Sequence, residues 1–173
     1  VVRVDASVAG RGDVVLTSDS GSIVQLAGGW LYNEASAVSA VLPNSGQYGS
    51  RVVISGTNLL GATHGTHITT VQLAGVDAEI VAGTSQTEIV VIADHNGAIV
   101  VGDIFIEANS GAFVVLEDAW EYVQAFTVDQ IVPAHGQLGT RVTVTGANLL
   151  GGGDAIVTVT LAGVAADVIS STN

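Results

Sequence analysis

The stretch that decides the fold is VLPNSGQYGSRVVISGTNLLG at residues 41–61, because a close copy, IVPAHGQLGTRVTVTGANLLG, follows at residues 131–151. Pro43 and Pro133 therefore lie 90 positions apart in a chain of 173 residues. Self-similarity at a fixed spacing is the signature of a chain built from copies of one unit, and it has to be recognised before any other assignment. The sequence predicts a tandem repeat with a module of about 90 residues.

Two more pairs of segments extend the repeat in both directions. LAGVDAEI from Leu73 recurs as LAGVAADV from Leu161, and GDVVLTSDSGSIVQLAGGWLY from Gly12 recurs as GDIFIEANSGAFVVLEDAWEY from Gly102. The order of the pieces predicts three parts. They are the C-terminal half of a module at residues 1–34, a complete module at residues 35–123, and the N-terminal half of a module at residues 124–173.

Differences between the copies indicate which side chains face inward. Val52 and Ile54 remain aliphatic as Val142 and Val144, whereas the residue between each pair changes from valine to threonine. This alternation has the two-residue period of a strand with one buried and one wet face. In the segments from Gly12 and Gly102, a tryptophan and a tyrosine near the end lie an even number of positions from aliphatic residues, on the same side of the expected strand. These aromatic residues are predicted to be core: Trp30, Tyr32, Trp120 and Tyr122.

The complete module contains seven strand candidates separated by turn residues. Gly, Asn, Asp and Ser clusters between the candidates tolerate turns and left-handed backbone. Seven short strands in about 90 residues favour an all-β, immunoglobulin-like sandwich. The candidates are residues 38–42, 51–56, 68–73, 78–82, 88–93, 99–108 and 112–122, with residues 43–46 expected as a turn.

The run from Pro43 through Ser45-Gly46, Gly49 and RVVISGTNL, followed by VQLAGV from Val71, resembles the IPT/TIG family of immunoglobulin-like domains, and the second copy carries the same signature. The resemblance implies compact antiparallel sandwiches, often in tandem in the extracellular parts of receptors and in secreted or surface proteins, where they act as spacers and binding modules. It also extends to domains of transcription factors and to domains beside starch-acting enzymes. It is specific for the fold and says less about function.

Composition excludes several classes of function. The chain has no Lys, four Arg against sixteen Asp and Glu, and a formal net charge of −12, so it lacks the basic surface that nucleic acid requires. It has no Cys for disulfides or thiolate ligands. Every apolar run is interrupted well before about 18 residues, so no membrane span is expected.

The sequence offers one adhesion motif, Arg11-Gly12-Asp13, the tripeptide that some adhesion receptors recognise. Gly12-Asp13 recurs as Gly102-Asp103 at the start of the equivalent strand, so a role in entering the strand is preferred over recognition.

No metal site, cofactor or catalytic centre is predicted. His64, His67, His95 and His135 fall in loops, and neither the calcium-loop spacing after Asp94 nor a nucleophile elbow is complete. Nothing singles out a carboxylate pair for glycoside hydrolysis. Asn58 and Asn148 are expected to bridge a turn, and threonines could carry O-linked sugars if the protein is secreted: Thr63, Thr66, Thr69, Thr70, Thr158 and Thr160.

The two half modules carry the functional hypothesis. A half sandwich leaves strand edges unpaired and apolar side chains in water, so something must cover it. Either the chain continues as a longer tandem array, or residues 1–34 of one copy complete residues 124–173 of another in a head-to-tail homopolymer. Both predict a non-enzymatic component of an extracellular or cell-surface fibre.

The alternatives are a tandem-domain ectodomain that binds a protein or glycan through loops such as residues 61–70 and, less favoured, an enzyme acting on a polysaccharide. The residues expected to pack between modules or subunits are Val14, Leu16, Val24, Leu26, Trp30, Tyr32, Val142, Val144, Leu149 and Leu161.

Overall fold

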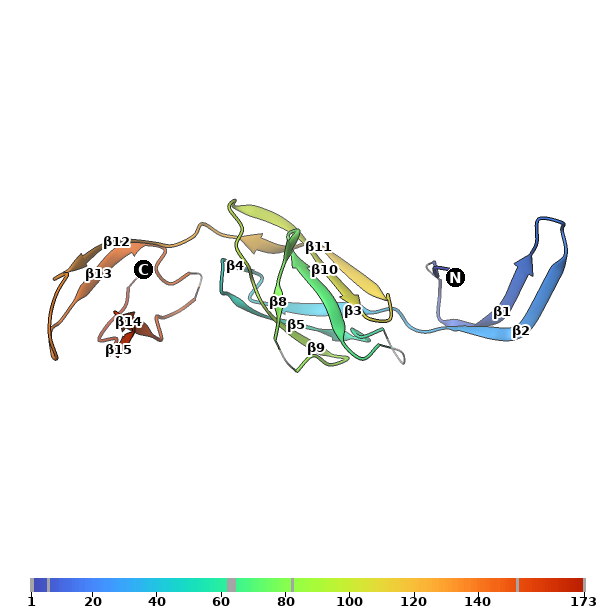
Figure 1. Cartoon of the computed structure of the whole chain (residues 1–173), viewed down its shortest axis with the longest axis horizontal. Helices are drawn as coiled ribbons and strands as arrows, with labels where there is room; N and C mark the ends of the chain where they lie inside the picture. Colours follow the sequence, from blue (N-terminus) through green and yellow to red (C-terminus); the bar gives the residue numbers. More distant parts are fainter. Residues whose placement is uncertain (1, 6, 62–64, 82, 152, 173) are drawn as a thin grey trace.

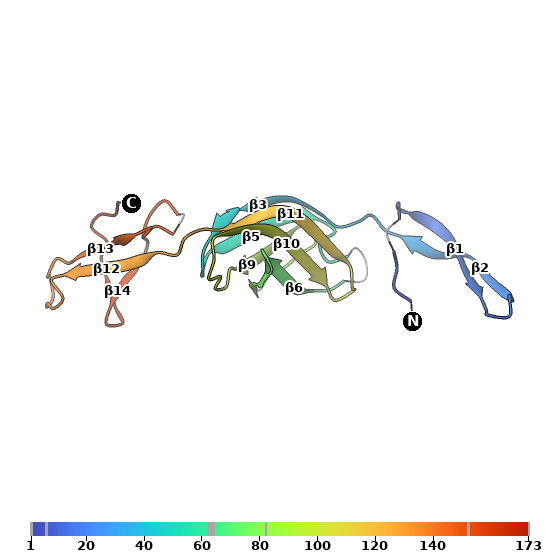
Figure 2. The ribbon, with the colours of Figure 1, turned by 90° about the horizontal axis from the view of Figure 1, so that it is seen from above.

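The computed structural model describes residues 2–5, 7–61, 65–81, 83–151 and 153–172. It forms three groups of strands in a row along the longest axis of the molecule (Figure 1), and the view from above gives the same order (Figure 2). An N-terminal hairpin, a central sandwich and a C-terminal segment follow one another. The first group consists of β1 (Gly10–Thr17) and β2 (Ile23–Tyr32), and the last of β12 (Thr127–Val132), β13 (Thr143–Ala147), β14 (Val159–Leu161) and β15 (Val164–Ala166).

The central sandwich contains two sheets, as the strand count predicted. One sheet has the order β4-β11-β10-β6-β7 and the other the order β3-β5-β9-β8. Neighbouring strands run antiparallel except for β4, which pairs in parallel with β11. Their bounds are β3 (Ala37–Leu42), β4 (Ser45–Gly46), β5 (Arg51–Thr57), β6 (Ile68–Leu73), β7 (Val76–Asp77), β8 (Glu79–Ile80), β9 (Glu88–Ile92), β10 (Val100–Ala108) and β11 (Phe113–Tyr122).

Alternating aliphatic residues build the core between these sheets. Val52 and Ile54 of β5 are completely buried, which confirms the inward face that the comparison of copies predicted. Trp120 and Tyr122 are buried as well and meet edge to face, with ring centroids 5.7 Å apart. An edge-to-face pair of this kind adds to the gain from burying two large aromatic rings. The other side chains of this core are Leu59, Leu60, Ile68, Val71, Leu73, Ile89, Val91, Ala93, Ile104, Ile106 and Ala108.

Two elements differ from the sequence-based expectation. The strand expected at residues 78–82 is shorter in the structure, where only β8 falls in that range and pairs with β9. A separate short strand, β7, comes just before it and pairs with β6 in the other sheet. The chain changes sheets at Ala78, whose N–H still bonds the Val71 carbonyl at 2.8 Å. Residues 43–46, expected as a turn, include β4, whose pairing with β11 depends on a contact far along the chain.

The structure as a whole is all-β, in agreement with the predicted immunoglobulin-like class. Among the strands of the described residues, the N-terminal hairpin pairs with none outside itself, and the C-terminal segment forms two separate two-stranded sheets, β12-β13 and β14-β15. Among the described residues we find no helix with the length and hydrophobicity that crossing a membrane would require.

Candidate interaction surface

The N-terminal hairpin and the β10–β11 hairpin of the central sandwich have the same construction. In β1–β2 the register aligns Gly12 with Trp30 and is interrupted by a bulge between Gly12 and Val14. In β10–β11 the register aligns Gly102 with Trp120, and the bulge lies at the equivalent place, between Gly102 and Ile104. The aromatic pair is also repeated, because Trp30 and Tyr32 meet edge to face with centroids 6.0 Å apart.

The two hairpins differ in what covers them. Trp120 and Ile106 are 0% and 1% exposed in the core, whereas Trp30 is 44% exposed and Leu16, at the position of Ile106, is 62% exposed. Val24 and Leu26 on the same face are exposed as well, while Val14 and Tyr32 are partly buried. Contiguous exposed apolar side chains make a face a candidate interaction surface. We call this face, formed by Val14, Leu16, Val24, Leu26, Trp30 and Tyr32, the hairpin face.

The C-terminal segment contains equivalents of other core residues of the central sandwich. Val142, Val144 and Leu149 are partly buried and Leu161 lies in the short strand β14. Their equivalents in the central sandwich, Val52, Ile54, Leu59 and Leu73, are almost completely buried. Within the part of the chain that the structure describes, Val142, Val144 and Leu149 are therefore less buried than their equivalents. We call Val142, Val144, Leu149 and Leu161 the segment face.

A strand edge accompanies the segment face. In the central sandwich β6 pairs with β7 on one side and with β10 on the other. The equivalent strand β14 pairs with β15 alone among the described strands. In the same way β5 has two neighbours, β3 and β9, whereas β13 has only β12 in the described ranges. An unpaired edge is a template for another strand.

Arg11 and Asp13 of the adhesion tripeptide are used within the hairpin itself. The Arg11 guanidinium donates to the Gly28 carbonyl at 3.0 Å, and the Asp13 carboxylate accepts from Gly28 N–H at 2.7 Å and from the Gln25 amide at 2.6 Å. These bonds, first the one from Gly28 and then the one from Gln25, lower the pKa of Asp13 below its ordinary value. The tripeptide lies in β1 at the bulge, and recognition by a receptor stays the less favoured interpretation.

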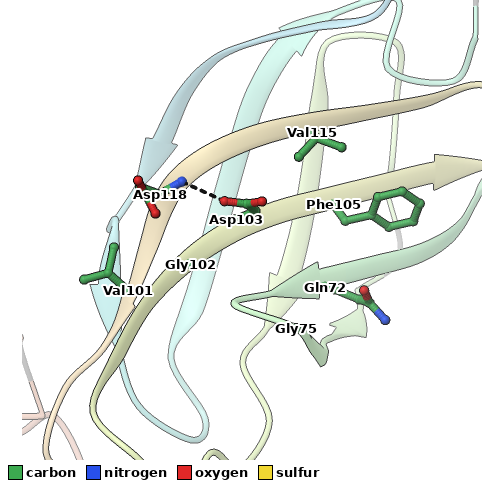
Figure 3. A pocket seen from close by; sticks show the side chains of 8 residues that line it. All are labelled: Gln72, Gly75, Val101, Gly102, Asp103, Phe105, Val115 and Asp118. Atoms are coloured by element: carbon green, nitrogen blue, oxygen red, sulfur yellow. Dashed lines mark hydrogen bonds between the residues drawn. The ribbon is translucent and has the colours of Figure 1, made fainter.

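The equivalent bulge in the central sandwich lies beside a shallow hollow on the outer face of the sheet. Asp103 accepts a hydrogen bond from the Asp118 N–H at 3.0 Å (Figure 3). Phe105 and Val115 line the same hollow, which β10, β11 and the turn at Gly75 border. The carboxylate of Asp103 therefore tightens a bulge, as Asp13 does in β1.

The histidines are spread along the molecule. His95 stacks on Tyr48, with ring centroids 3.8 Å apart, and His67 lies beside Thr66. His135 is exposed in the C-terminal segment, and His64 lies outside the described residues. In the described ranges no three His, Cys, Asp or Glu side chains gather as metal ligands would.

The residues expected at turns and as glycan acceptors take part in local bonding. Asn58 and Asn148 both have positive φ, 54° and 53°, and Asn58 Nδ2 donates to the Glu34 carbonyl at 3.5 Å. The Thr69 hydroxyl donates to the Glu107 carbonyl at 3.0 Å, and Thr66 accepts from Asn109. Thr63 lies outside the described residues, and the acceptor role of Thr70, Thr158 and Thr160 stays a prediction.

Comparison with known proteins supports the fold. Residues 127–173 match the family model described as the IPT/TIG domain, which confirms the resemblance for the C-terminal segment. No curated protein matches the chain.

Three solved structures resemble parts of the molecule. One is a putative phosphatase from Bacteroides thetaiotaomicron, with 19% identity over 55% of this chain and 20% of that one, and a TM-score of 0.43. An auxiliary nutrient binding protein from Bacteroides ovatus is 21% identical over 56% of this chain and 22% of its own, also with a TM-score of 0.43. The full extracellular region of plexin A4 is 18% identical over 75% of this chain and 11% of its own, with a TM-score of 0.48. The chain thus spans less than a quarter of each of these proteins.

Proposed function

We propose that the chain is a non-enzymatic structural subunit of an extracellular or cell-surface fibre. In this fibre the N-terminal hairpin of one copy completes the sandwich that residues 124–173 of another copy begin. One observation carries the proposal: the exposed hairpin face has the register and the residue positions of β10–β11, which the central sandwich buries. The hairpin is therefore shaped for a place in a sandwich, and the segment face offers one.

The register inside the central sandwich gives the docked arrangement. There Ile104 of β10 lies opposite Leu73 of β6, and Ile106 lies opposite Val71. The corresponding pairs between two copies are Val14 with Leu161 and Leu16 with Val159. Docking in this way would add β1 to the free edge of β14 and place Trp30 and Tyr32 over Val142 and Val144.

Burial of apolar surface would drive the docking. Moving a side chain such as leucine or valine from water to full burial contributes roughly 1.5–3 kcal/mol. Pairing of β1 with β14 would also satisfy backbone groups along an open strand edge. Because the two faces are different surfaces at opposite ends of the chain, the contact is heterologous and propagates into an open filament.

The charge and composition are compatible with this role. A formal charge of −12 on each chain keeps long assemblies apart from one another in solution. The extracellular setting is inferred from the IPT/TIG resemblance, whose members often occur in tandem in secreted and surface proteins. O-linked glycans on exposed threonines belong to the same proposal.

Two other arrangements remain as outcomes of the test. The same hairpin and segment could be joined within a much longer tandem chain, which gives a similar fibre with covalent continuity. A binding ectodomain would instead be monomeric and would recognise its ligand through loops at the ends of the sandwich.

Electron microscopy of the 173-residue chain, together with intact-mass measurement of native material, tests the proposal. Filaments that assemble from chains of about 17.4 kDa would support completion between copies. Filaments made only by a much longer native chain would show that the modules are joined covalently within one polypeptide. Dispersed monomers at all concentrations would contradict the fibre and favour the binding ectodomain.

A further inference from the structure

One glutamine holds the joint between the central sandwich and the C-terminal segment. Gln47 directly follows β4 and is only 7% exposed. Its Oε1 atom accepts a hydrogen bond of 2.9 Å from the Phe126 N–H, in the linker that leads to β12. A Cβ atom added to Gly151 would collide with the Gln47 amide, so the same side chain also touches the loop after β13. Gln47 thus reaches from one module to two places on the next.

The loop that carries Gln47 is repeated at the far end of the molecule. The Gln47 N–H donates to the Ser50 hydroxyl at 3.0 Å, and the Gln137 N–H donates to the Thr140 hydroxyl at 2.9 Å. In the reverse direction, the Ser50 N–H donates to the Gln47 carbonyl at 3.0 Å, and the Thr140 N–H donates to the Gln137 carbonyl at 2.9 Å. The glycine two positions after each glutamine has φ of +85° and +84°. Gln137 is therefore held in the backbone conformation of Gln47, but it is exposed.

The segment that would meet Gln137 is also held in place. The residue 90 positions before Phe126 is Ser36, in the linker between β2 and β3. The Ser36 hydroxyl donates to the Asn58 carbonyl at 2.7 Å, and the Asn58 amide donates to the Glu34 carbonyl. Two bonds thus fix this linker on the central sandwich, so Ser36 N–H has the chain position that Phe126 N–H has at the observed joint.

We infer that Gln137 of one copy accepts a hydrogen bond from the Ser36 N–H of the next copy, so that the joint seen at Gln47 recurs between subunits. The inference rests on the proposed function, because only a docked hairpin brings the linker of the second copy beside Gln137. It adds a second contact outside the hydrophobic faces. Its consequence is that joints within and between subunits have the same geometry, and the fibre repeats at each module.

Three variants of the full chain separate the side-chain acceptor from simple packing. Gln137→Leu keeps most of the volume and removes the acceptor, while Gln137→Glu keeps an acceptor oxygen. Gln47→Leu is the matched control, because it removes the same bond within the chain. Joint angles are measured on individual fibres by electron microscopy.

We expect Gln137→Leu to widen the distribution of joint angles at every second joint, the one between subunits. The ratio of joints in the geometry of the unmodified fibre to joints outside it should fall roughly two- to tenfold, which is the equivalent of one neutral hydrogen bond. Gln137→Glu should stay close to the unmodified chain, and Gln47→Leu should widen the other set of joints. Normal fibres whose joints are unchanged in Gln137→Leu would overturn this inference while leaving the proposed function intact. An equally wide distribution in Gln137→Glu would overturn the acceptor role. Absence of fibres from the unmodified chain would reject the proposed function, and the inference with it.

Discussion

Trp30 and Trp120 occupy the same position in two hairpins of identical register, yet Trp120 is fully buried and Trp30 is 44% exposed. Each ring meets a tyrosine two residues later edge to face. The local geometry of the hairpin therefore forms without the sandwich around it. What the N-terminal hairpin lacks is a covering sheet, and that difference leads to the first two predictions.

A disulfide tests the register of the proposed docking. We expect a chain carrying both Leu16→Cys and Val159→Cys to form covalent ladders on oxidation, seen as multimers on a denaturing gel without reductant. The chain has no cysteine of its own, so every multimer reports the introduced pair. Directly opposed residues of neighbouring strands have a separation that a disulfide can bridge.

The matched control moves one cysteine by a single residue. Val15→Cys with Val159→Cys places the two thiols on opposite faces of the sheet, because side chains alternate along a strand. Ladders of equal yield from both pairs would refute the register. If the first pair instead gave monomers in which the disulfide joins two parts of the same chain, the contact would form within one copy.

Replacement of Trp30 by alanine tests the hairpin face. Truncation of a buried tryptophan costs about 3–5 kcal/mol, so we expect the concentration needed for assembly to rise by roughly two to nearly four orders of magnitude. The midpoint of thermal unfolding of the central sandwich should not change, since Trp30 lies outside its core. Sedimentation and calorimetry measure the two effects separately.

Trp120→Ala is the companion variant for this prediction. It removes the equivalent ring from an assembled core and should destabilise the central sandwich by about 3–5 kcal/mol. If Trp30→Ala assembles at the same concentration as the unmodified chain, the hairpin face does not form the contact.

Much of this arrangement could be predicted from the sequence, because comparison of the copies separates residues that face the core from those that face water. Val52 and Ile54 kept their aliphatic character between the copies, and both are buried. The strand change at Ala78 could not be predicted in this way, since the hydrophobic pattern does not record which sheet a short segment joins. β4 was missed for a related reason: two residues in a turn-like sequence become a strand only through pairing with β11.

The role of Gln47 was also missed, although a signal was present. Both quoted stretches contain Gly-Gln at the same place, while the residues directly before and after this pair differ between the copies. A polar side chain kept in both copies beside a glycine suggests a specific bond. Its partner, the Phe126 N–H, lies 79 positions away and is visible only in the structure.

The third prediction concerns the ionisation of Asp13. Hydrogen bonds from Gly28 and Gln25 to its carboxylate lower its pKa below 3.8, the ordinary value. We therefore expect the Gly28 amide resonance, followed by NMR during acidification, to shift with a midpoint below pH 3.8. The contribution of this carboxylate to hairpin stability is present above the unfolded pKa and is lost as the pH falls through the lower folded pKa.

A variant of the second donor provides the control for this titration. Gln25→Ala removes one of the two bonds and should move the midpoint part of the way back toward 3.8. A midpoint at or above the ordinary value in the unmodified hairpin would show that the hydrogen bonds from Gly28 and Gln25 to Asp13 do not form in solution.

The last prediction concerns Tyr122 and alkaline pH. Burial, and to a smaller extent the charge of Asp94, raises the pKa of Tyr122 above its ordinary value of 10.0. The unfolded chain releases the phenol proton at about that ordinary value, whereas the folded sandwich keeps it. The stability that this group provides is therefore complete below pH 10 and declines as the pH rises through the folded pKa.

Tyr122→Phe removes this dependence on pH. The hydroxyl of Tyr122 is buried and has no hydrogen-bond partner among the described residues, so its loss at pH 7 should cost little or slightly stabilise the central sandwich. We expect the unmodified chain to lose unfolding free energy steeply above pH 10 and the variant to lose less, in denaturant titrations at pH 7, 9, 10 and 11. Tyr48→Phe is the control, because the Tyr48 ring is exposed and stacks on His95 at the surface. If the unfolding free energies of the unmodified chain and Tyr122→Phe fall in parallel as the pH rises, the phenol is hydrated in solution. The core around Tyr122 and Trp120 would then be packed less tightly than the structure describes.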